Sequence, residues 1–149
     1  MVKNTIAIDA MGGDKAPKSV IAGLAISLIR NPGTNYIVYG DENKIIPLIK
    51  NREKLKDVMK IVHVEDWIRG DEKASKSLRR IKTTSMGLAI SAVVDGEADA
   101  IVSAGNSGAL LAMSIFGLRK LPGISRPALA AVMPTVSGEV FALDLGANI

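Results

Sequence analysis

Short runs of β-branched and other apolar residues alternate with helical patterns along this chain, and this alternation restricts the fold more than any other feature. The runs expected as strands are Thr5–Asp9, Tyr36–Tyr39, Met59–Val64, Ala100–Ser103, Ala128–Met133 and Val140–Leu145. The expected helices are Pro17–Arg30, Asn43–Lys50, Met86–Asp95 and Ser107–Leu121. Because strands that are apolar on both faces must be covered on both faces, the pattern predicts an α/β fold of three layers around a mostly parallel sheet.

Composition narrows the kinds of protein that this chain can be. With 149 residues, of which 48% are hydrophobic, it can bury the core of one domain. The absence of cysteine excludes a disulfide framework and a cysteine nucleophile, and it fits a reducing cytoplasmic setting. Only 3% of the residues are aromatic, which disfavours single-stranded nucleic acid as a partner, whereas the net charge of +4 suits an acidic protein or an anionic membrane surface.

The segment Ala98-Asp-Ala-Ile-Val-Ser-Ala-Gly-Asn-Ser-Gly108 carries the clearest functional signal. An apolar strand ends in a polar turn, and an apolar helix follows immediately. Gly105 and Gly108 let the backbone bend sharply, and the first N–H groups of the helix attract negative charge. We therefore expect a phosphate or carboxylate to bind at this turn.

Two more glycine-rich turns follow expected strands. One is Asp9-Ala-Met-Gly-Gly-Asp14, and the other is Gly146-Ala-Asn148 after the strand Val140–Leu145, which we place in the same sheet. Ligands bind beyond the carboxyl ends of parallel strands, so the three turns together could surround one anion. A single glycine-rich turn would mean little, because glycine serves steric needs at many tight turns.

Several well-known motifs are absent. The sequence has no Gly-x-x-x-x-Gly-Lys-Ser/Thr phosphate loop, no Gly-x-Gly-x-x-Gly dinucleotide fingerprint and no Gly-x-Ser-x-Gly nucleophile elbow. His63, the only histidine, ends a different strand, so a serine triad is not expected. One histidine and no cysteine leave no basis for a metal site, and no cofactor is expected.

Five ordered blocks of the sequence add a more specific pattern. They are Ile6-Ala-Ile-Asp-Ala-Met-Gly-Gly-Asp14 with Pro17, Leu78-Arg-Arg80 continuing to Thr84-Ser-Met86, Ala98–Ala109, Leu121-Pro-Gly-Ile-Ser-Arg-Pro-Ala-Leu129 and Leu143-Asp-Leu-Gly-Ala-Asn148. Together they resemble the PlsX-type phosphate acyltransferases. Such enzymes are about twice this long, so the resemblance implies that residues 1–149 are the amino-terminal portion of one α/β acyltransferase domain, Rossmann-like and incomplete, with the carboxy-terminal half absent.

The resemblance implies a reaction and a set of partners. A fatty acyl group would move from acyl carrier protein to inorganic phosphate, giving acyl phosphate for phospholipid synthesis. The implied protein is a cytoplasmic homodimer that touches the inner membrane face peripherally and passes its product to a membrane glycerol-phosphate acyltransferase. We expect the 149-residue chain alone to associate with itself through an uncovered apolar edge and to have little or no activity.

The expected substrate-binding residues come from the three turns and from the start of one helix. They are Asp9, Gly12, Gly13, Asp14, Ser85, Ser103, Gly105, Asn106, Ser107, Gly108, Gly146 and Asn148. Among them, Asn106 and Asn148 are candidate hydrogen-bond donors to phosphate or to the oxyanion. A carboxylate repels phosphate, so Asp9 and Asp14 are expected to hold the glycine loop, Asp14 as a helix cap. A helix cap is the alternative role for Ser85.

Arg79, Arg80 and Lys82 belong to the densest basic run and are the candidate docking site for acyl carrier protein. The alternative interpretation of this run is a solvated helix face. Two other functions stay open at this point. One is an anion-binding remnant without turnover, and the other is a nicotinamide-dependent dehydrogenase of related fold.

Overall fold

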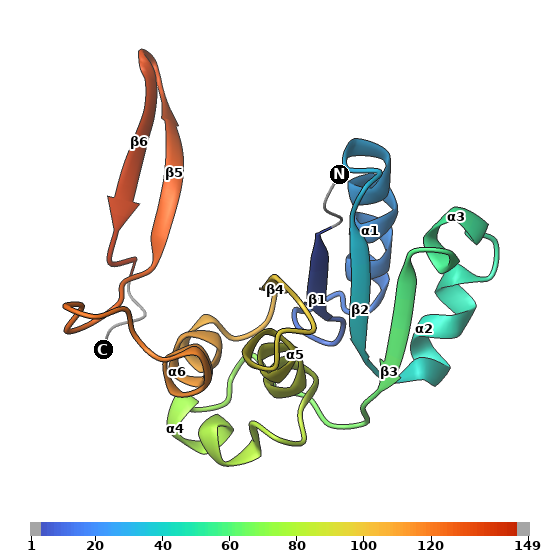
Figure 1. The fold of residues 1–149 in the computed structure, drawn as a ribbon, viewed down its shortest axis with the longest axis horizontal. Coiled ribbons are helices and arrows are strands. Elements are labelled where there is room, and N and C mark those ends of the chain that lie inside the picture. Colours follow the sequence, from blue (N-terminus) through green and yellow to red (C-terminus); the bar gives the residue numbers. More distant parts are fainter. Residues whose placement is uncertain (1–3, 146–149) are drawn as a thin grey trace.

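A computed structural model of the protein describes residues 4–145, and four parallel strands form its central sheet. The strands are β1 (Thr5–Asp9), β2 (Asn35–Gly40), β3 (Met59–His63) and β4 (Ala100–Ser103). They lie side by side in the order β3-β2-β1-β4 (Figure 1). The register pairs Ile8 of β1 with Val38 of β2 on one side and with Val102 of β4 on the other.

Helices cover both faces of this sheet, which confirms the expected three-layer α/β class. The helices are α1 (Lys18–Arg30), α2 (Glu42–Ile49), α3 (Glu53–Lys56), α4 (Ala74–Ser77), the 3-10 helix η1 (Leu78–Arg80), α5 (Ser85–Val94) and α6 (Ser107–Leu118). Alternate residues of β1 serve the two faces, because successive side chains of a strand point in opposite directions. Ile8 packs with Ile21 and Leu24 of α1, whereas Ala7 packs with Ala89 of α5.

The strand order creates a switch point between β1 and β4. From β1 the chain moves outward through β2 and β3, and it then returns through α5 to place β4 on the other side of β1. The helix after β1 covers one face, while α6, the helix after β4, packs with α5 on the opposite face. Two loops that leave neighbouring strands toward opposite faces open a crevice, which is where sheets of this type bind ligands.

The last two strands depart from the prediction. β5 (Ala130–Thr135) and β6 (Gly138–Leu143) form a separate antiparallel hairpin, so the placement of the last strand in the parallel sheet was wrong. Figure 1 shows the hairpin projecting away from the sheet, beyond the end of α6. The physical reason is the connection: residues 136–137 join the two strands, whereas a parallel crossover needs about a dozen residues or more. Phe141 is 72% exposed, so the hairpin leaves apolar surface open.

The charge-rich segment between β3 and α5 folds over the carboxyl edge of the sheet. Ile68 is buried with Met86, Ile90 and Met113, so this segment is anchored in the core between α5 and α6. Residues 74–80 then form α4 and η1, which lie beside α6 (Figure 1). Among residues 4–145, every helix is too short or too polar to cross a bilayer.

Candidate functional site

A cleft of about 410 Å³ opens at the switch point, beyond the carboxyl ends of β1 and β4. Three segments line it: the turn after β1, the segment after β3 and the turn after β4. The lining residues are Met11, Gly13, Asp14, Trp67, Ile68, Arg69, Gly70, Ala104, Gly105, Asn106 and Ser107. The structure thus brings together the first two of the three glycine-rich turns predicted to meet. The third turn, with Gly146 and Asn148, lies outside the described residues.

A buried carboxylate ties the walls of this cleft together. Asp9 is only 2% exposed, and it accepts hydrogen bonds from the Ser85 hydroxyl at 2.6 Å and the Ser103 hydroxyl at 2.7 Å. The Met11 N–H donates to the same carboxylate at 3.2 Å. These bonds join β1, its following turn, the start of α5 and the end of β4, so we call Asp9, Ser85 and Ser103 the polar knot. Asp9 therefore has the loop-holding role that its charge suggested.

The two glycine turns touch directly because neither carries a side chain at the contact. A Cβ atom added to Gly12 would lie 2.5 Å from Asp9 Oδ2 and 2.7 Å from the Gly105 nitrogen. Gly13 has a φ of +100°, a conformation that other residues rarely adopt. Its own Cβ position would lie 3.0 Å from the Ala104 carbonyl oxygen. Glycine is thus required here for close packing of two backbones and for one left-handed turn.

The turn after β4 presents backbone amides rather than a free side chain. The Asn106 Oδ1 caps α6 by accepting from the Ala109 N–H at 2.9 Å, and its Nδ2 donates to the carbonyls of Gly70 at 3.0 Å and Glu72 at 2.9 Å. The Gly105 N–H donates to Ser103 Oγ at 3.1 Å. The expected donor roles of the Asn106 side chain and the Gly105 amide therefore do not fit this arrangement, because both are used internally.

Three amides of this turn are available. Within residues 4–145, the backbone N–H groups of Asn106, Ser107 and Gly108 make no protein hydrogen bond. They lie at the positive end of the dipole of the twelve-residue helix α6. This arrangement can hold an anion in the cleft.

Two expected helix caps are placed differently. Asp14 is exposed, and α1 has Pro17 at its N-cap without a side-chain hydrogen bond, so the capping role of Asp14 was wrong. The cap of α5 is Thr84, whose hydroxyl accepts from the Gly87 N–H at 3.3 Å. Ser85 is the first helical residue and donates to Asp9 instead, so its alternative capping role was also wrong.

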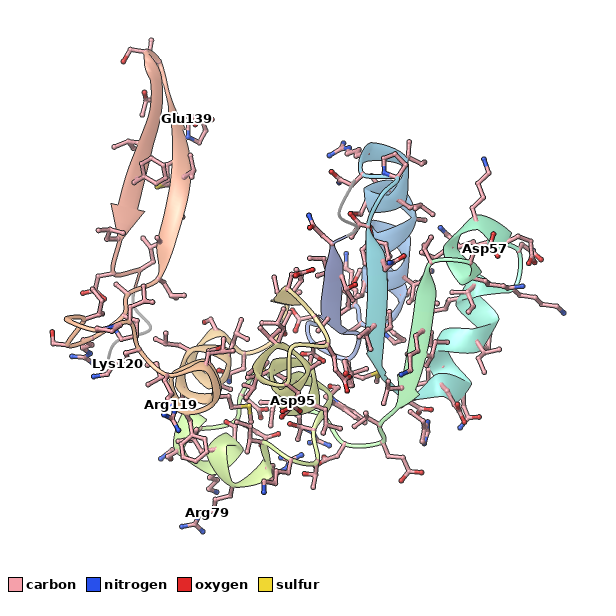
Figure 2. All side chains as sticks on the ribbon, viewed as in Figure 1. Asp57, Arg79, Asp95, Arg119, Lys120 and Glu139 are labelled. Carbon is pink, nitrogen blue, oxygen red and sulfur yellow. The ribbon has the colours of Figure 1, made fainter. Side chains whose placement is uncertain are left out.

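Arg80 does not point outward as a docking residue should. Its guanidinium donates to Asp66 with two nitrogens, to Glu72 Oε2 at 2.7 Å and to the Trp67 carbonyl at 3.0 Å. Hydrogen bonds to Asp66 are the main reason why the pKa of Arg80 is raised above its ordinary value. Its use in carrier docking therefore does not fit, because this cation is already paired. Arg79 and Lys82 are exposed, and Figure 2 shows Arg79 directed away from the helices.

Sequence reasoning missed the segment that follows β3. Trp67, Arg69 and Gly70 line the cleft, yet the charge-rich run that contains them was left unassigned or counted as a basic surface. A usable signal was present, because a segment that leaves a parallel strand begins at the same edge as the neighbouring turns. Within the part of the chain that the structure describes, no three acidic, histidine or cysteine side chains gather as metal ligands.

The chain is similar in sequence to one described family and to several named proteins. Residues 4–149 match the family described as "Fatty acid synthesis protein". A phosphate acyltransferase of Xanthobacter autotrophicus is 52% identical over 145 residues, which are 97% of this chain and 41% of that protein. The phosphate acyltransferases of Bradyrhizobium diazoefficiens and Parvibaculum lavamentivorans are 52% and 49% identical, covering 99% and 97% of this chain but 42% and 40% of their own lengths. The chain thus spans about two fifths of the relatives that it matches.

Proposed function

The chain belongs to this fatty acid synthesis protein family, and we propose that it supplies the phosphate-binding part of an acyltransferase. The proposed reaction moves a fatty acyl group from acyl carrier protein to inorganic phosphate and yields acyl phosphate for phospholipid synthesis. The relatives' name, phosphate acyltransferase, supports acyl transfer that involves phosphate. The observation that carries the proposal is the cleft at the switch point, which is lined by Asn106 and Ser107 at the amino terminus of α6, where backbone amides are open.

The proposed chemistry needs positioning more than a reactive side chain. A thioester is an activated acyl donor, and phosphate is itself a nucleophile. One phosphate oxygen attacks the thioester carbonyl carbon and forms a C–O bond, while the carbonyl oxygen becomes an oxyanion. The intermediate then collapses, the C–S bond breaks, and the thiolate of the carrier leaves and takes up a proton. No acyl bond to the protein is required in this sequence.

The chain's own residues would orient one partner of that reaction. The amides of Asn106, Ser107 and Gly108 would hold phosphate at the end of the α6 dipole. The polar knot fixes the two turns so that these amides keep their direction without rearranging during the reaction. Donors held in this way act by positioning the phosphate oxygen for attack on the thioester carbonyl carbon.

The remaining partners belong to the proposal as well. Arg79 and Lys82 are exposed and available to steer an acidic carrier protein, although Arg80 is not. A homodimer, a cytoplasmic location and a peripheral contact with the membrane and its glycerol-phosphate acyltransferase follow from the resemblance. The dehydrogenase alternative gains no support from the relatives, which are named as acyltransferases.

Binding and turnover should be tested separately. Trp67 is the only tryptophan and lines the cleft, so its fluorescence can report ligand binding by the chain. We expect saturable quenching or a spectral shift with inorganic phosphate and none with nicotinamide cofactors. A response to the nicotinamide cofactor but not to phosphate would instead support the dehydrogenase.

Turnover is best measured in a chimera. This chain would replace the matching part of the Xanthobacter autotrophicus phosphate acyltransferase, to which it is 52% identical. We expect phosphate-dependent release of carrier thiol from acyl carrier protein by the chimera and little or none by the 149-residue chain alone. Phosphate binding by the chain without any turnover in the chimera would favour the alternative of a non-catalytic anion-binding remnant.

A further inference from the structure

The segment of residues 66–72, here called the strap, contributes residues 67–70 to one wall of the cleft, the wall that sequence reasoning missed. We infer that Arg69 of the strap is the side chain that binds the phosphoryl group in the cleft, opposite the open amides of α6. This inference rests on the proposed function and deepens it. It assigns the ligand class as a dianionic phosphoryl group, either inorganic phosphate or the phosphate end of an acyl phosphate.

The distribution of ion pairs leaves Arg69 as the available cation. Of the three carboxylates of the strap, Asp66 and Glu72 are bound by Arg80, and Asp71 does not line the cleft. Lys44, which lies over the Trp67 ring at 4.8 Å from its centre, is paired with Asp41 at 3.2 Å. Among residues 4–145, the Arg69 guanidinium has no ion pair and no hydrogen bond. Arg69 is thus the one basic residue that lines the cleft, and its side chain is not engaged by a carboxylate of the described residues.

The backbone of the strap is fixed on both sides of Arg69. Ile68 is 3% exposed and packs in the core beside α5 and α6. The Gly70 carbonyl accepts from Asn106 Nδ2 at 3.0 Å, and the Arg69 N–H donates to Glu72 Oε1 at 2.9 Å. Because Asn106 also caps α6, one side chain ties the strap to the helix whose amides face the cleft. The base of Arg69 is thus held at a set place relative to those amides.

This pairing of groups suits phosphate better than a monoanion. A planar guanidinium can donate two parallel hydrogen bonds to phosphate oxygens, while the backbone amides take the remaining oxygens. Asp14 is the one carboxylate that lines the cleft, and it makes no hydrogen bond within residues 4–145. Its charge opposes an anion, so an uncompensated cation is needed for a dianion to bind there.

The test replaces Arg69 with glutamine and measures phosphate binding. Hydrogen bonds to charged groups contribute about 1.5–3 kcal/mol, so we expect Arg69→Gln to weaken binding about ten- to a hundredfold. Arg30→Gln is the matched control, because Arg30 ends α1 at the opposite edge of the sheet and the substitution removes the same charge. It should change the dissociation constant less than twofold. Parallel titrations with inorganic phosphate and acetyl phosphate distinguish the two sources of the phosphoryl group.

Calorimetry should accompany the Trp67 signal, since Trp67 lies near the substituted residue, and far-ultraviolet circular dichroism should confirm that the variants fold. Arg69→Lys keeps the positive charge but cannot donate two parallel hydrogen bonds, so it should bind phosphate with an intermediate affinity. Equal binding by wild type, Arg69→Gln and Arg30→Gln would overturn the role of Arg69 and leave the proposed phosphate site standing. Failure of the wild-type chain to bind either ligand would overturn both. Equal losses in the two glutamine variants would show a general charge effect and also reject the assignment.

Discussion

Replacing Gly12 with alanine should disrupt the site, because the added methyl group would clash with the polar knot. The added Cβ would lie 2.5 Å from Asp9 Oδ2, 2.7 Å from the Gly105 nitrogen and 2.8 Å from Ser103 Oγ. Real Cβ atoms essentially never lie under 3.0 Å from such neighbours, so something must move. One neighbour is backbone, and the others belong to a buried carboxylate and its donor. The methyl group must therefore separate the two turns or break a hydrogen bond of Asp9.

The cost can be worked from these contacts. Overpacking a well-filled interior costs about 1–3 kcal/mol. A lost hydrogen bond to a buried charged group costs about 1.5–3 kcal/mol. The overpacking cost and the hydrogen-bond cost do not simply add. If the two turns move apart, the clash is relieved but a hydrogen bond of Asp9 is lost. We expect a loss of about 3 kcal/mol in the free energy of unfolding, a large part of the total stability of a domain of this size.

Urea denaturation followed by circular dichroism measures this loss, and Gly23→Ala is the matched control. Gly23 lies inside α1 with nothing within 4 Å of its Cβ position. There the same substitution should stabilise the protein by about 0.5–1 kcal/mol, since alanine is the better helix former. The expected result is that Gly12→Ala lowers the free energy of unfolding and Gly23→Ala raises it. A Gly12→Ala variant as stable as wild type would refute the close contact of the two turns.

Three more predictions concern the cleft, the hairpin and the core. Asp14→Asn should tighten phosphate binding about two- to fivefold in the Trp67 titration, because it removes a partly screened repulsion; weaker binding would mean that the carboxyl group holds the ligand. Phe141→Ser should reduce self-association in light scattering without lowering the melting temperature, because the ring is 72% exposed; an unchanged oligomer would exclude this surface. The pKa of Tyr39 is raised, first by burial and then by Glu97 and Asp95, so the unfolded chain ionises before the folded one. The free energy of unfolding should therefore fall as the pH rises above 10.0, and it should fall less in Tyr39→Phe; equal slopes would contradict this.

The parallel part of the fold could be predicted from the sequence because each strand and helix has its own pattern of apolar residues. The strand expected at Thr5–Asp9 is β1, and the one expected at Ala100–Ser103 is β4. The hairpin could not be assigned from the apolar pattern alone, since parallel and antiparallel strands share it. The Ser137-Gly138 pair between the two runs was the available sequence signal for a tight reversal, and in the structure Gly138 has a φ of +145°.

The site was only partly predictable, because its decisive bonds join distant residues. Asp9 binds Ser85 and Ser103 across 76 and 94 positions of sequence. Nothing in the local pattern at Ser85 separates this role from that of a helix cap, since serine suits both. The glycines of the two turns were recognised, yet the reason for Gly12 is a contact with the other turn rather than its own backbone angle.

The basic residues show most clearly why sequence alone could not complete the site. Arg69, Arg79 and Arg80 belong to one basic run and carry the same charge, so the sequence alone does not distinguish their roles. In the structure, Arg80 pairs with Asp66 and Glu72. These ion pairs make Arg80 unavailable for docking a partner, and they also keep these two carboxylates from pairing with Arg69. Had Glu72 paired with Arg69 instead, the cleft would hold no free cation and Asp14 would make it repel phosphate. The proposed affinity of this cleft for an anion therefore depends on Asp66 and Glu72 pairing with Arg80 rather than with Arg69.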